Sequence, residues 1–103
     1  MSHTDYLTAQ QRSARVLDTL LSMRLPEAEW SISTVYPDKL DGQISRSMRS
    51  LEQARADLAT WATAFNAAVD WNRLGGQWPH VVFTVNGVTV RVWTYATGEV
   101  DTR

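Results

Sequence analysis

The stretch VVFTVNGVTVRVWTY, Val81–Tyr95, decides how this chain folds. Two runs of alternating residues flank Asn86-Gly87, and this dipeptide is the strongest short-range signal for a β-hairpin. Asn and Gly both tolerate the positive φ angles that the two central residues of a type I′ turn require. The sequence therefore predicts two antiparallel strands joined by a two-residue turn.

This turn also determines which side chains face one another across the hairpin. Side chains alternate between the two faces of a strand, so one face collects only apolar pairs. These pairs are Val85 with Val88, Phe83 with Val90, and Val81 with Val92. Other elements must cover that face. The opposite face carries mostly polar and aromatic side chains: His80, Val82, Thr84, Thr89, Arg91, Trp93 and Tyr95.

The composition is typical of one folded domain. The chain has 103 residues, 44% of them hydrophobic and 20% charged, which suffices for a single core. It contains no cysteine, which excludes disulfides, thiolate catalysis and cysteine-based metal sites. The formal net charge of −1 argues against a strongly cationic nucleic-acid-binding surface. Because we find neither an apolar leader nor an apolar run of roughly 18 residues, we expect a cytoplasmic protein without membrane contact.

Thr4–Arg24 is predicted to form the first helix. Asp5 near its start and Arg24 near its end complement the helix dipole. Pro26 is expected to end it, because proline cannot continue a helix. The apolar stripe at helical spacing consists of Leu7, Ala14, Leu17, Leu20 and Leu21.

Trp30–Tyr36 and Lys39–Ser45 alternate as strands do, and Pro37-Asp38 between them is a turn signal. These runs predict an earlier hairpin. Gly42 in the second run indicates a bulge or a sheet edge. Trp30 is expected in the core.

Ser47–Trp71 is predicted to form the second helix. Its alanines favour a helix, and Trp61 lies on its apolar stripe and is expected in the core. Gly75-Gly76 is expected to supply the left-handed residue that ends the helix. Trp71 and Trp78 flank these glycines and are expected to close the end of the core.

The element order predicts an α+β fold, αββαββ, in a single domain, 1–103. Short connections favour a four-stranded, mostly antiparallel sheet with both helices packed on one face. We expect an ordered core over about 4–96 and a flexible tail over 97–103.

If both helices cover the apolar face, the other face of the last hairpin is open to solvent. Trp, Tyr and Arg are enriched where interfaces concentrate their binding energy. Arg91, Trp93, Tyr95 and His80 therefore predict a non-enzymatic binding or regulatory module, acting by homodimerisation or by contact with another protein. The alternative for Trp93 is local packing on its cross-strand neighbours.

The start of the second predicted helix is another candidate site. Ser45, Arg46, Ser47 and Arg49 bring hydroxyl and guanidinium groups to a helix N-terminus, where free N–H groups bind anions. Binding of a nucleic acid or a phosphate ligand is therefore the alternative function. A serine-capped helix start with solvated arginines explains the same residues.

Residues suited to catalysis are few. An enzyme would need His80 to meet Asp41 or Glu29 in one pocket. The sequence shows no nucleophile–histidine–acid order, no metal-ligand spacing and no phosphate-binding loop. It therefore predicts neither an enzyme nor a bound cofactor or metal.

Four stretches of the chain carry a resemblance. They are Leu25-Pro26-x-Ala28-x-Trp30-Ser31-Ile32, Leu40-Asp41-Gly42-Gln43, the Ala- and Arg-rich helix around Trp61, and Asn86-Gly87-Val88-x-Val90-x-Val92-Trp93. Together they resemble small uncharacterised proteins of actinobacterial genomes and of their phages or mobile elements. The resemblance spans Leu17 to Tyr95. It implies a bacterial cytoplasmic protein and no particular activity.

Overall fold

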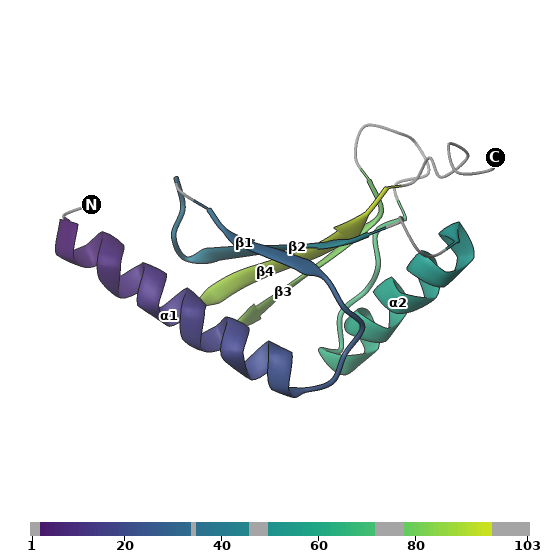
Figure 1. The fold of residues 1–103 in the computed structure, drawn as a ribbon, viewed down its shortest axis with the longest axis horizontal. Coiled ribbons are helices and arrows are strands. Elements are labelled where there is room, and N and C mark those ends of the chain that lie inside the picture. Colours follow the sequence, from purple (N-terminus) through teal and green to yellow (C-terminus); the bar gives the residue numbers. More distant parts are fainter. Residues whose placement is uncertain (1–2, 34, 46–49, 72–77, 96–103) are drawn as a thin grey trace.

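The computed structural model describes residues 3–33, 35–45, 50–71 and 78–95 (Figure 1). The predicted order αββαββ is confirmed. The helices are α1 (His3–Ser22) and α2 (Leu51–Ala64), and the strands are β1 (Glu29–Ile32), β2 (Lys39–Ile44), β3 (His80–Val85) and β4 (Val88–Thr94). Both helices lie on the same side of one four-stranded sheet, as predicted. No helix in the described ranges is long and apolar enough to span a membrane. The predicted tail, 97–103, lies outside the described residues.

The strand order is β1-β2-β4-β3, so the two hairpins meet through their second strands. Both hairpins are antiparallel, and β2 pairs with β4 in parallel. The sheet is therefore mixed, and the prediction of a mostly antiparallel sheet holds within the hairpins only. A parallel pair requires a long crossover connection. The chain through α2 and β3 provides it.

The last hairpin forms as predicted. Asn86 and Gly87 both have positive φ, 49° and 81°, as the two-residue turn requires. The register places Val85 opposite Val88 and His80 opposite Trp93, with each intermediate pair in the predicted place. The apolar face of the hairpin is covered by the helices, and most of its side chains are buried.

The stripe predicted for α1 is wrong in most positions. Leu20 is buried, but Leu7, Ala14 and Leu21 are exposed. The helix instead buries a row that contains small and polar side chains: Ala9, Ser13, Val16 and Leu20. A close approach to the sheet explains the difference, because Ser13 Oγ donates a buried hydrogen bond of 2.5 Å to the carbonyl of Pro37. α1 also ends at Ser22, well before Pro26.

The bounds predicted for α2 are wrong at both ends. The helix begins at Leu51, after the N-cap Ser50, and not at Ser47. The helix ends at Ala64, and two residues later Asn66 takes a left-handed conformation with φ of 53°. Gly75-Gly76 therefore does not end the helix. Beyond it the chain turns, and Asp70 forms a β-bridge with His80.

Ser50 and Gln53 form a capping box at the start of α2. The Gln53 backbone N–H donates to Ser50 Oγ at 3.1 Å, and the Ser50 N–H donates to Gln53 Oε1 at 3.3 Å. We expect Ser50→Ala to lower the free energy of unfolding by about 1 kcal/mol, because the first turn loses an acceptor. Urea unfolding followed by circular dichroism measures this change.

Thr63→Ala is the matched control for the cap, since it removes an exposed hydroxyl from the same helix. It should leave the urea midpoint unchanged or raise it slightly. Ser50→Asp should keep most of the stability, because a carboxylate also caps an N-terminus. Equal midpoints for Ser50→Ala and the wild type would contradict the role of the cap.

Gly42 marks neither a bulge nor a sheet edge, because it lies in the central strand β2. It pairs with Trp30, whose ring lies against it: a Cβ on Gly42 would come within 2.7 Å of the nearest ring carbon. Trp30 also contacts Trp61 edge to face, with centroids 5.5 Å apart. Trp61 is buried as predicted, whereas Trp30 is half-buried at the margin of the core.

Candidate functional site

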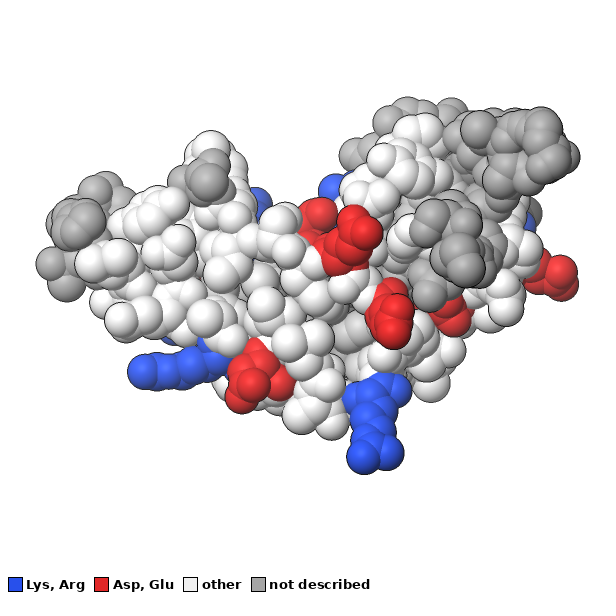
Figure 2. Space-filling view, in the orientation of Figure 1, with Lys and Arg blue, Asp and Glu red and all other residues white. Residues whose placement is uncertain are grey.

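The sheet face turned away from α1 and α2, called the outer face below, carries the candidate site (Figure 1). Paired residues on neighbouring strands point to the same side, so the outer-face side chains lie in rows across the sheet. In strand order β1, β2, β4, β3, one row is Ser31, Asp41, Arg91, Val82, and the next is Glu29, Gln43, Trp93, His80. In the space-filling view, acidic side chains gather near the middle of the upper side (Figure 2).

Asp41 organises the centre of the outer face. Its Oδ2 accepts a hydrogen bond of 2.8 Å from Trp93 Nε1, and its Oδ1 lies 3.5 Å from Arg91 Nη1. The Arg91 guanidinium also lies over the Trp93 ring, 5.5 Å from the centroid. The side chains of Arg91 and Asp41 are 38% and 41% exposed, so their pairing stabilises the fold by at most about 1 kcal/mol.

The indole hydrogen bond holds the Asp41 carboxylate in place, whereas Arg91 is less restrained. A guanidinium has several N–H donors in a planar fork, and the contact with Asp41 engages one of them at long range. The remaining donors can therefore bind a carboxylate that approaches from solvent.

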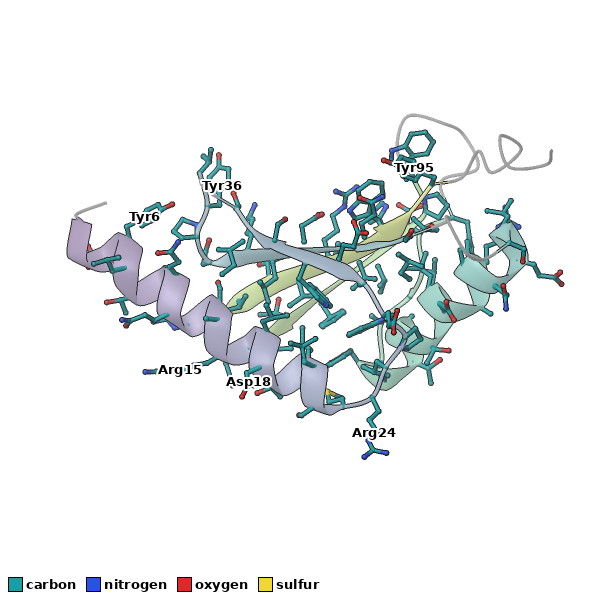
Figure 3. The ribbon with its side chains drawn as sticks, viewed as in Figure 1. Tyr6, Arg15, Asp18, Arg24, Tyr36 and Tyr95 are labelled. Atoms are coloured by element: carbon teal, nitrogen blue, oxygen red, sulfur yellow. The ribbon has the colours of Figure 1, made fainter. Side chains whose placement is uncertain are left out.

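Ring side chains gather at one end of the outer face: Trp78, His80, Trp93 and Tyr95. Tyr95 packs edge to face against both Trp93 and Trp78, with centroids 5.2 Å apart in each pair. Figure 3 places Tyr95 at the side of the sheet remote from the helices. Tyr95 is 38% exposed and Trp93 is half-buried. Trp93 therefore packs on Tyr95 and still reaches solvent, and its role in an interface stays a prediction.

His80 is tied to the segment that follows α2. Its backbone N–H and C=O pair with those of Asp70 at 3.0 and 2.8 Å, and its Nε2 lies 3.8 Å from Asp70 Oδ2. Its Nδ1 lies 2.9 Å from the carbonyl of Trp78, so in the neutral ring Nδ1 carries the proton and donates it there. The side chain is only 14% exposed. His80 is thus held as part of the fold.

The pairings expected of an enzyme differ from those in the structure. The carboxylate beside His80 is that of Asp70, and Asp41 is engaged by Trp93 and Arg91. Glu29 stands on the opposite edge strand, three strand spacings or about 14 Å away. His80 therefore does not converge with Glu29 in one pocket.

The predicted anion site falls largely on residues that the structure does not describe. Arg46, Ser47 and Arg49 lie outside the described residues, and Ser45 follows β2. The first turn of α2 begins at Leu51 and not at Ser47. That turn contains Glu52, which already complements the helix dipole. Anion binding stays a prediction.

Two residues near His80 differ from the sequence-based expectation. Asp70 lies outside the helix predicted over Ser47–Trp71, and Trp78 packs on Tyr95 at the outer face and does not close the end of the core. Asp41 lies in a strand, as the alternating pattern of Lys39–Ser45 predicts. Alternation with Leu40 does place Asp41 on the outer face. Its contact with Arg91 depends on the parallel pairing of β2 with β4, for which the sequence has no local signal.

A hollow lies on the helix side of the sheet. It has a volume of about 280 Å³ and is lined mainly by apolar side chains, among them Leu20, Leu25 and Trp61. The indole N–H of Trp61 already donates a hydrogen bond of 3.0 Å to the carbonyl of Pro26, so it is not available to a ligand. This hollow therefore offers less specific chemistry than the outer face.

No protein-family model matches the chain, and comparison with the curated proteins and with the solved structures found no similar protein. The function must therefore be inferred from the geometry of the outer face.

Proposed function

We propose that this protein is a non-enzymatic binding module that contacts another protein, or a second copy of itself, through the outer face. The observation that carries the proposal is the cluster of Arg91, Trp93 and Tyr95, partly exposed on the sheet face away from both helices. These residue types dominate binding energy at protein interfaces. The resemblance to actinobacterial proteins favours the cytoplasm of a bacterium as the setting.

The position of the rings outside the core supports this proposal. The buried core and the side chains packed against it come from the helices, the inner sheet face and the connecting segments. Trp78, Trp93 and Tyr95 do not belong to that set. The cluster is therefore aromatic surface that the core does not require, and such a patch on a sheet commonly marks an interaction site.

Site-specific photo-crosslinking in the cells that produce the protein tests the proposal. A photoreactive residue replaces Val82, which is 47% exposed in the same outer-face row as Arg91. We expect a discrete adduct with a protein, whether another chain or this one. Adding Trp93→Ala should reduce its yield by roughly tenfold or more, because a central tryptophan contributes about 2 kcal/mol or more.

Leu21 is the control position, since it is 63% exposed on α1. A photoreactive residue there should not give the adduct. Circular dichroism should show that Trp93→Ala remains folded. The proposal fails if position 82 gives no adduct, if position 21 gives the same adduct, or if Trp93→Ala leaves the yield unchanged.

A further inference from the structure

We infer that the outer face binds a second copy of this chain, face to face, about a two-fold axis parallel to the strands between β2 and β4. This inference rests on the proposed function, because it uses the same surface and specifies the partner. Its support is the distribution of charge along the rows of the outer face.

The two central strands of the outer face carry side chains of opposite charge. The acidic residues Glu29 and Asp41 stand on β1 and β2. In the row of Asp41, the neighbouring strand β4 carries Arg91, and Val82 ends the row on β3. The row of Glu29 ends in His80, which lies beside the carboxylate of Asp70, and Lys39 stands in the row on the other side of Asp41. Opposite charges therefore stand side by side at the centre of the face, Asp41 on β2 and Arg91 on β4.

The proposed axis places the opposite charges of the two copies over one another. It places β2 of one copy over β4 of the other at the same height, so Asp41 lies over Arg91 of the second copy, and Arg91 lies over its Asp41. Face-to-face sheets pack about 10 Å apart, a gap that an arginine and an aspartate side chain can bridge together.

The other two-fold axis in the interface plane gives the opposite result. An axis perpendicular to the strands, passing along the row of Asp41 and Arg91, would place each of these residues over its own counterpart. Like charges would then face one another in a contact that excludes water, which is unfavourable. Charge thus selects the axis parallel to the strands.

The Asp41–Arg91 pair is exposed and loose enough for each side chain also to contact its counterpart of opposite charge in the second copy. Both side chains are close to two-fifths exposed, and their nearest atoms are 3.5 Å apart, a long contact for an ion pair. In the dimer, two such pairs would form one alternating network of four charges. In the same contact, Trp93 would cover Gln43 of the second copy.

The size of the face predicts a weak, reversible dimer. Four strands about 4.8 Å apart and about six residues long at 3.3 Å each give a face of roughly 350 Å² per copy. The total is well below the roughly 1,200–2,000 Å² of stable interfaces. Self-association should therefore appear only at high protein concentration.

Charge reversal with purified protein tests this inference. In sedimentation velocity from about 10 µM to about 1 mM, the wild type should pass from monomer to dimer. Asp41→Arg and Arg91→Asp should each stay monomeric over this range, because each variant faces like charges across the axis. An equimolar mixture of the two should associate again, since every cross-axis pair is then opposite, with a dissociation constant within about tenfold of the wild type.

Two further variants keep the test independent of folding defects. The double variant Asp41→Arg/Arg91→Asp restores opposite charges both within and between chains, and it should dimerise like the wild type. Arg15→Asp reverses a charge on α1, which Figure 3 places on the helix side, and it should also behave like the wild type.

The outcomes separate this inference from the proposed function. The inference is overturned if the wild type stays monomeric throughout, if either single reversal still dimerises, or if the mixture fails to associate. A monomeric wild type whose position 82 crosslinks to a different protein would still support the proposed function. Absence of any adduct at position 82, both in cells and in the purified protein at about 1 mM, would remove both.

Discussion

Trp61→Ala is expected to lower the free energy of unfolding by about 3–5 kcal/mol, a large share of the roughly 5–15 kcal/mol of a typical domain. Trp61 is buried and stacks against Phe83 and Phe65 with centroids 6.4 and 6.2 Å away. Its edge-to-face contact with Trp30 and its hydrogen bond to Pro26 connect α2 to β1 and to the segment before it. Truncation would leave a cavity that these rigid rings cannot fill.

Urea unfolding followed by circular dichroism measures this loss. Trp93→Ala is the matched control, because it removes the same side chain from the outer face and should cost much less. Trp61→Phe should fall between the two, since it keeps most of the ring volume and loses the hydrogen bond to Pro26. Similar losses for Trp61→Ala and Trp93→Ala would show that the core is not centred on Trp61.

Gly42→Ala is expected to destabilise the protein by about 1–3 kcal/mol, although alanine is normally favoured over glycine within a strand. The new Cβ would lie 2.7 to 2.9 Å from three ring carbons of Trp30. The ring is rigid and rests against Trp61, so it cannot yield by rotating a flexible end. The clash therefore exceeds the gain of roughly 0.5–1 kcal/mol from a stiffer backbone.

A double-mutant cycle tests the cause of this effect. In a Trp30→Ala background, Gly42→Ala has no ring to displace, so its effect should become neutral or stabilising. Urea midpoints of the four proteins give the coupling between the two positions. The same loss in both backgrounds would mean that the backbone at Gly42, and not the Trp30 ring, requires glycine.

The sequence predicted the last hairpin and its two faces because the information is local. Asn86-Gly87 allows a single tight turn, and a two-residue turn leaves one register. With alternation of side chains, this register places Arg91, Trp93 and Tyr95 on one face. The patterns of the other segments predict the element order αββαββ in the same local way. Both helices then pack on the apolar face, because that face must be buried.

Only the tertiary structure decided where α2 ends and which side of α1 is buried. Periodicity marked a broad apolar band on α1, but the sheet selected the neighbouring row with Ser13, whose hydroxyl finds a partner at Pro37. Alanine-rich sequence continued beyond α2, but the chain left the helix at Asn66 so that Asp70 could pair with the edge of β3. In both places packing and pairing outweighed a weak intrinsic preference.

The candidate site is divided in the same way. Local alternation was sufficient to place Asp41 on one strand face and Arg91 on another. Their contact at the centre of the outer face exists only because β2 pairs with β4 in parallel. That pairing joins segments about fifty residues apart. The pairing forms because both hairpins pack their apolar faces under the same two helices. No short stretch of the sequence therefore encodes it.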